Sequence, residues 1–159
     1  MTMPVPDLEE TSVPGWRLRS LLDSSRPARR TTRVYVASPV EGAAEIEFSL
    51  HSVPGHPLRA CYPFGAHDLA VSVVAPAGGE GLAARLLRGL VPALFTAEPR
   101  CRRVIAAPDE DDTAKQLLLE EGGFLRVTEA DLPGGTVVLY AVEPPSLAGV
   151  STALDDMPH

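Results

Sequence analysis

The stretch DLAVSVVAPAGGEGLAARLLRGLVPALF, residues 68–95, decides the fold of this chain. It predicts an apolar strand, a glycine-containing turn and an amphipathic helix. Residues 102–124 then repeat the order of strand, turn and helix. A strand that leads through a glycine turn into a helix offers free backbone N–H groups to an anionic ligand. The centre of the chain therefore predicts both a βαβα arrangement and a candidate cofactor site.

The apolar pattern defines the elements of the first half of this stretch. Leu69–Val74 is nearly all apolar, which is typical of a central strand buried on both faces. From Gly81 to Phe95 the apolar residues follow helical spacing. Pro92 lies inside that pattern, so the helix is expected to kink or to lose a hydrogen bond there.

The second half is shorter and more acidic. Val104–Ala107 predicts a short apolar strand. Asp111 or Asp112 is expected to cap the helix that follows, because aspartate oxygens accept hydrogen bonds from the first free N–H groups of a helix. The Gly122-Gly123 pair is expected to end that helix as a C-cap.

Hairpins are predicted on both sides of this centre. Arg33–Ala37 is rich in β-formers, Ala44–Val53 alternates apolar and polar residues, and residues 41–42 supply a turn between them. Downstream, strands over Leu125–Thr128 and Thr136–Val142 flank a Pro-Gly-Gly turn. Both pairs are expected to be antiparallel.

The fold class that follows is α+β, a mixed and mostly antiparallel central sheet flanked by helices, in the order β-β-β-α-β-α-β-β. Residues 1–32 are expected to form a flexible or partly helical lead, since they are rich in proline and arginine; Trp16–Leu22 within them suits either a short helix or a strand. Residues 33–143 are expected to form the domain, and residues 144–159 a disordered tail.

Composition narrows the classes of function. The net charge is −7, and the one basic cluster, Arg26, Arg29, Arg30 and Arg33, lies in a linker-like segment. Both observations argue against nucleic acid as a partner. No apolar run approaches the roughly 20 residues of a membrane span, and the N-terminus lacks a secretion signal. We therefore expect a cytoplasmic protein. The two cysteines, Cys61 and Cys101, do not form a zinc or redox motif, so no metal is expected.

The residues that follow the central helix resemble those of a known superfamily. The runs Leu94–Val104, Pro108-Asp109, Glu121–Phe124 and Leu139–Glu143, with Asp68–Ser72 upstream, are similar to the GCN5-related N-acetyltransferases (GNAT). The similarity covers about residues 33–143 and is closest to the siderophore branch, which acylates the side-chain amine or hydroxylamine of lysine in mycobactin- and aerobactin-type pathways. It implies the acyl-CoA N-acyltransferase fold.

The resemblance implies acetyl-CoA or a longer acyl-CoA as co-substrate, with no metal. The pantetheine would lie beside the central strand, and N–H groups of the glycine turn would hold the pyrophosphate. The amine would attack the thioester while a base removes its proton. The cofactor-binding residues implied in this way are Val73, Val74, Gly79, Gly81, Leu82 and Asp112.

Three positions depart from the motifs of the branch. Ser72 stands where the branch carries a histidine, Pro76 stands at a basic position before the glycines, and Asp112 replaces an asparagine. Glu80 also places a negative charge beside the expected phosphates.

Ser72 and Asp109 are the candidate catalytic residues, although a hydroxyl is no base near neutral pH. Asp109 would orient or deprotonate the amine, and its alternative role is helix capping. His51 and His56 could replace the missing base, and both are expected to be exposed and without function. His67 is expected to point to the opposite face of its strand from Ser72.

Two functions stay open at this point. The first is N-acylation of a lysine- or diamine-type small molecule in siderophore or related secondary metabolism. The second is a catalytically degenerate acetyltransferase-like protein that binds a ligand or assists a pathway without turnover. Because residues 1–32 are too short to rebuild the N-terminal helical wall of the branch, we expect an acceptor pocket that is open or is completed by a second copy or a pathway partner.

Overall fold

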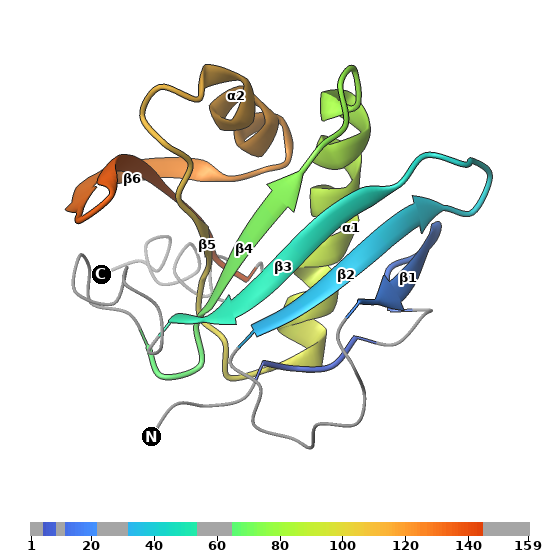
Figure 1. Ribbon diagram of the computed structural model, residues 1–159. Helices are drawn as coiled ribbons and strands as arrows, with labels where there is room; N and C mark the ends of the chain where they lie inside the picture. Colours follow the sequence, from blue (N-terminus) through green and yellow to red (C-terminus); the bar gives the residue numbers. More distant parts are fainter. Residues whose placement is uncertain (1–4, 9–11, 22–31, 54–64, 145–159) are drawn as a thin grey trace, which may run out of the picture.

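A computed structural model describes residues 5–8, 12–21, 32–53 and 65–144 of this chain. These residues form one seven-stranded sheet with the strand order β1-β2-β3-β4-β5-β7-β6 (Figure 1). Neighbouring strands are antiparallel except β4 and β5, which are parallel. The mixed, mostly antiparallel sheet of the α+β prediction is confirmed.

The observed elements match the expected order with one strand added at the start. The strands are β1 (Trp16–Ser20), β2 (Thr32–Pro39), β3 (Ile46–Ser52), β4 (Leu69–Val74), β5 (Val104–Ala106), β6 (Leu125–Leu132) and β7 (Gly135–Val142), and the helices are α1 (Glu80–Ala97) and α2 (Thr113–Glu121).

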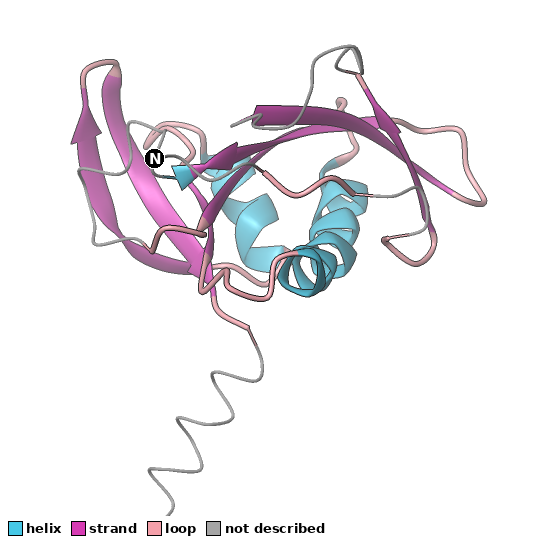
Figure 2. Ribbon diagram, turned by 90° about the horizontal axis from the view of Figure 1, so that it is seen from below, coloured by secondary structure: helices cyan, strands magenta, loops and turns pink. Residues whose placement is uncertain are grey.

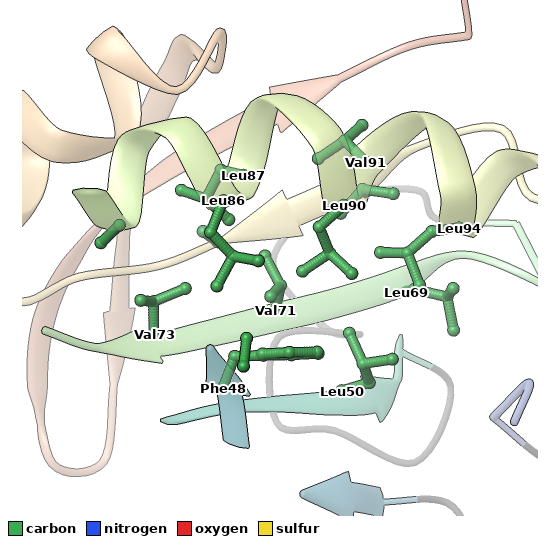
Figure 3. Close-up of a cluster of buried hydrophobic side chains, with 14 of the residues drawn as sticks. Phe48, Leu50, Leu69, Val71, Val73, Leu86, Leu87, Leu90, Val91 and Leu94 are labelled. Atoms are coloured by element: carbon green, nitrogen blue, oxygen red, sulfur yellow. The ribbon is translucent and has the colours of Figure 1, made fainter. Parts of the chain in front are cut away.

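The two faces of the sheet carry separate apolar clusters. Side chains of β3 and β4 alternate, so Phe48, Leu50, Val71 and Val73 point toward α1 and pack on its leucines (Figure 3). Ala70 points the other way and joins a smaller cluster with residues of β5, β6 and β7. Figure 2 shows the two helices beside each other, with the strands curving around them. The helices therefore cover one face of β4.

Helix α1 runs without interruption through Pro92, which lies on its exposed side. Proline has no N–H to donate, so the helix loses one hydrogen bond there, which is one of the two predicted outcomes. The exposed position lets water satisfy the carbonyl that is left without a partner. Within the described residues, neither helix is both long and apolar enough to cross a membrane.

Both predicted ends of α2 are confirmed. Asp112 is its N-cap, and the Oδ1 atom of Asp112 accepts a hydrogen bond from the Lys115 backbone N–H at 3.0 Å. At the other end, Gly123 adopts a φ of 98°, and the Phe124 N–H donates to the Leu119 carbonyl at 2.9 Å. This geometry is the glycine-dependent Schellman motif.

The buried carboxylate of Asp68 joins the starts of β4 and β5. Its Oδ1 atom accepts hydrogen bonds from the backbone N–H groups of Arg102 and Arg103 at 3.0 and 3.1 Å. Its Oδ2 atom accepts a third from the Gly65 N–H at 2.8 Å. Asp68 is only 2% exposed, so it anchors backbone rather than facing a ligand.

The described part of the lead differs from the prediction of a flexible segment. Trp16–Ser20 is strand β1 at the edge of the sheet, and Val5, Leu8 and Val13 are buried in the main core. Their apolar side chains cover the sheet next to α1, which the proline content of the segment concealed. The predictions for His56, Cys61, residues 22–31 and residues 145–159 lie outside the described residues.

Candidate active site

Strands β4 and β5 pair only at their beginnings and then separate. Leu69 pairs with Val104 and Ala70 with Ile105, but β5 ends at Ala106 while β4 continues to Val74. Beyond Ala70, the β5-facing edge of β4 has no strand partner in the described part of the chain. Such an edge leaves backbone N–H and C=O groups for an extended ligand to bind.

A cavity of about 280 Å³ occupies the region where the two strands separate. Strand β4 contributes four consecutive residues to it, and the segment from the end of β5 to α2 contributes most of the others. Its lining is His51, Ala70, Val71, Ser72, Val73, Ala106, Ala107, Pro108, Asp109, Asp112, Lys115 and Leu119.

The cavity has access to both faces of the sheet. Val71 and Val73 belong to the face covered by α1, whereas Ala70 and Ser72 belong to the opposite face. Because all four residues line the same cavity, it passes through the gap between β4 and β5. Two reactants can therefore approach one point from opposite sides.

The glycine turn lies directly after β4 and carries free N–H groups. Gly79 is the N-cap of α1, and no side chain caps the helix there. The first turn of a helix has N–H groups without intrahelical acceptors, which here belong to Glu80, Gly81 and Leu82. A Cβ atom added at Gly81 would meet no atom within 4 Å, so a ligand has room against this backbone. These features fit a pyrophosphate group.

A side chain at position 81 tests whether the pyrophosphate of CoA binds at this turn. We expect Gly81→Ala to weaken CoA binding about tenfold or more, because its Cβ would occupy the position of a phosphate. Stability should be unchanged or slightly higher, since alanine is about 1 kcal/mol better than glycine within a helix. Isothermal titration calorimetry and thermal unfolding measure both quantities. The matched control is Gly134→Ala, which also has open space around it but lies at the β6–β7 turn; equal CoA affinity in the two variants would contradict the assignment.

The negative charge of Glu80 at the glycine turn repels an anionic ligand. Glu80 is exposed in the first turn of α1, and Pro76 occupies the position where the resemblance implies a basic residue. A carboxylate about 4 Å from another negative charge costs about 1 kcal/mol in water. The same carboxylate stabilises the positive end of the helix dipole.

We therefore expect Glu80→Gln to tighten CoA binding about fivefold, and to lower the free energy of unfolding by about 0.5 kcal/mol. The gain in affinity should shrink as salt is added. Glu121→Gln, at the far end of α2, is the control with the same change of charge. CoA affinity that does not respond to Glu80→Gln would show that the pyrophosphate binds elsewhere.

Asp109 and Asp112 both line the cavity, but their side chains have different roles. Asp112 is committed to capping α2. Asp109 is held by its backbone, which forms an isolated β-bridge with Val137 and accepts a hydrogen bond from the Gln116 side chain at 3.0 Å. The alternative role predicted for Asp109, capping of the helix, thus belongs to Asp112. The exposed carboxylate of Asp109 is left to act on a ligand.

His51 also lines the cavity, which corrects the expectation that this side chain is simply exposed. It is half-buried on the face of β3 opposite α1, with Nδ1 3.2 Å from the Thr32 Oγ1 atom and Nε2 3.2 Å from the Ser49 Oγ atom. Burial lowers the pKa of the His51 imidazole from its ordinary value of 6.5. His67, by contrast, does not line the cavity, and its Nδ1 atom is buried without a hydrogen-bond partner.

Of the predicted site residues, the structure places Ser72, Val73, Asp109 and Asp112 around this one cavity. Gly79, Gly81, Leu82 and Val74 do not line it but follow at the end of β4 and the start of α1. Lys115 and Leu119 were missed, although their helical spacing places them on one face of α2. Among the described residues, no group of three His, Cys, Asp or Glu side chains could hold a metal ion.

Sequence comparison finds a matching family. Residues 40–132, more than half of the chain, match the family described as an acetyltransferase (GNAT) domain. The lysine N-acyltransferase MbtK of Mycobacterium tuberculosis is 38% identical over 69 residues, which are 43% of this chain and 33% of the relative. The MbtK of Mycolicibacterium paratuberculosis is 34% identical over 85 residues, or 54% of this chain and 38% of that one. The matched region thus spans little more than a third of these curated relatives.

Solved structures show the same fold. The aminoglycoside acetyltransferase AAC(6')-Ib, in complex with paromomycin and acetyl-CoA, superposes with a TM-score of 0.64 at 20% identity, over 74% of this chain and 68% of that one. RimJ of Mycobacterium smegmatis, in complex with CoA-disulfide, superposes with a TM-score of 0.54 at 17% identity, over 74% and 55% of the two chains.

Proposed function

The chain belongs to the GNAT acetyltransferase family, and from this premise we propose that it is an acyl-CoA-dependent N-acyltransferase. Its acceptor would be the side-chain amine or hydroxylamine of a lysine- or diamine-type small molecule, in siderophore or related secondary metabolism. The observation that carries the proposal is the cavity that crosses the sheet where β4 and β5 separate.

The arrangement of the cavity suits direct transfer. An acyl-CoA would extend along the unpaired edge of β4, with its pyrophosphate at the free N–H groups of α1 and its thioester in the cavity. Val73 and Val74 would contribute backbone groups, and Gly79, Gly81 and Leu82 would surround the phosphate-bearing portion. Asp112 would lie near the thioester end of the ligand, because it lines the cavity. The structures of AAC(6')-Ib with acetyl-CoA and of RimJ with CoA-disulfide show that this fold accommodates CoA ligands.

The acceptor would enter from the face opposite α1. Ser72 opens onto that face, and the Asp109 carboxylate lies on the cavity wall where it can attract and orient a protonated amine. The match to lysine N-acyltransferases supports a lysine-like acceptor. A second copy of the chain or a pathway partner would complete the acceptor side, since the cavity is open to solvent.

The direct test combines binding with turnover. Calorimetry with acetyl-CoA and longer acyl-CoAs should give a binding heat and a thermal shift, and lysine, N6-hydroxylysine and cadaverine should each be tried as acceptors while release of the CoA thiol is recorded. Binding together with amine-dependent thiol release supports the proposal. Absence of binding at millimolar CoA overturns it, and binding without thiol release favours a degenerate binding protein instead.

A further inference from the structure

Any amine that attacks a thioester must lose a proton, so the cavity needs a base that is unprotonated near pH 7. The titratable side chains that line it in the described part of the chain are His51, Asp109, Asp112 and Lys115. Asp109 is already assigned to attracting and orienting the amine. Asp112 is occupied as the cap of α2, and a lysine amine is ordinarily protonated. His51 is the imidazole of this set, the side chain whose ordinary pKa lies nearest to neutrality.

The position of His51 is determined by neighbouring strands rather than by a loop. It pairs with Ala70 of β4 on one side and with Thr32 of β2 on the other. Hydroxyl groups of Thr32 and Ser49 hold its two ring nitrogens at 3.2 Å. A ring held at both nitrogens has one orientation relative to the cavity, which proton transfer requires.

One of these hydroxyls, that of Ser49, lies between the ring and Ser72 of the cavity. Ser49 lies directly opposite Ser72 in the β3–β4 register, so the two side chains share one face. Directly opposite residues have Cβ atoms about 5 Å apart, a distance that two hydroxyls or one bridging water can span. The path for the proton would therefore run from the Ser72 hydroxyl to the Ser49 hydroxyl and then to the Nε2 atom of His51.

Burial keeps this imidazole ready to accept a proton. It lowers the pKa of His51 below 6.5, so the ring is neutral at pH 7. The charged groups that share the cavity with it are Asp109 and Asp112, from the segment between β5 and α2, and Lys115 from α2. The residues of β2 and β4 that pair with it, Thr32 and Ala70, are uncharged.

We propose that His51 is the general base of the proposed acyl transfer, and that it takes the proton through the hydroxyls of Ser72 and Ser49. This assignment rests on the proposed function. The amine reacts in its neutral form, after its ammonium proton has gone to water; its nitrogen forms a bond to the thioester carbonyl carbon, and the carbon–sulfur bond breaks with its electron pair going to sulfur. The proton of the amine moves by way of the hydroxyls to Nε2 of His51. The thiolate then takes a proton from water, and the imidazolium returns its proton to water.

The test uses the whole chain with acetyl-CoA and the acceptor that gives the fastest thiol release. We expect His51→Gln to lower kcat about 100-fold or more, while the KM of the amine changes less than about threefold and CoA still binds. His67→Gln is the control, because His67 lies outside the cavity. In the wild type, kcat/KM should rise with pH through a midpoint below 6.5, and this rise should be absent in His51→Gln.

Moving the imidazole distinguishes proton transfer from a packing role. Ser72→His combined with His51→Gln places an imidazole on the adjacent strand, on the same face of the sheet. The kcat of this double variant should be at least tenfold higher than that of His51→Gln alone. A His51→Gln protein with kcat within threefold of wild type overturns the assignment but not the proposed function. A double variant that binds CoA without any recovery also overturns it, and a wild type without turnover overturns the proposed function and this assignment together.

Discussion

Replacement of Asp109 by alanine is expected to lower kcat/KM for the amine about 100-fold while CoA binds as in the wild type. Asp109 lines the cavity with an exposed side chain, and its carboxylate is not needed to cap α2, because Asp112 does so. Removing it takes away the negative charge that would draw a protonated amine into line with the thioester, and lost orientation of this kind commonly costs two orders of magnitude.

The fold should survive this change, because the structural contacts of Asp109 are made by its backbone. The bridge to Val137 and the hydrogen bond from Gln116 do not involve the carboxylate. Asp111→Ala removes the same charge two residues away, at a position that does not line the cavity. Steady-state kinetics with varied amine, together with calorimetry for CoA, measure the result. Equal losses in the two variants would mean that only the general charge of the turn matters.

Two titratable groups of the cavity, Asp109 and His51, should differ in the kinetic constant that they change. Asp109→Ala removes attraction for the amine, so much of its effect should appear in KM. His51→Gln removes a proton acceptor that acts in the transition state, so its effect should appear in kcat. A comparison of the two variants under one set of conditions separates positioning of the acceptor from deprotonation.

The largest loss of stability is expected for Asp68→Ala, which should lower the free energy of unfolding by about 3 kcal/mol or more. The buried carboxylate accepts hydrogen bonds from three backbone N–H groups, and alanine would leave all three without an acceptor. A hydrogen bond to a charged group contributes about 1.5–3 kcal/mol, and buried unpaired donors add a desolvation cost.

Urea unfolding measures this loss, and two further variants interpret it. Asp68→Asn keeps one acceptor oxygen, so it should lie between alanine and the wild type. Asp131→Ala removes an exposed carboxylate that accepts a hydrogen bond from the Thr136 hydroxyl at 2.8 Å, and it should change stability by less than about 0.5 kcal/mol. A loss below 1 kcal/mol in Asp68→Ala would show that water satisfies these N–H groups.

Asp68 contributes to the family resemblance in the sequence, whereas in the structure its role is to hold the backbone. In the sequence it begins the run that resembles the siderophore branch. In the structure it joins the start of β4 to the segment before β5 and thereby fixes the point from which the two strands diverge. The cavity depends on that divergence, so the anchor supports the site without touching a ligand.

Most of the secondary structure could be predicted because its causes are local. The alternation of β3, the apolar run of β4, the helical spacing of α1 and the glycine pair after α2 each express the geometry of a few neighbouring residues. Strand β1 was left undecided and the buried lead was missed. Val5, Leu8 and Val13 are buried by contact with distant elements, which no local pattern reports.

The candidate site was predicted in part, for the same reason. The glycine turn, Ser72 and Asp109 follow from their order along the chain and from the family resemblance. The environment of His51 depends on the register of three strands, and the segment between β3 and β4 is too long for a turn type to set that register.

The sequence by itself therefore determined the elements, their order and the family of this protein. Only the tertiary structure decided that Asp112 rather than Asp111 caps α2, that Asp109 lines the cavity, and that His51 lines the same cavity as Ser72. The choice between Asp111 and Asp112 is local, since either aspartate suits a helix N-terminus. The cavity positions of Asp109 and His51 arise from pairing between strands distant in sequence and from the separation of β4 and β5, and no short stretch of residues encodes either one.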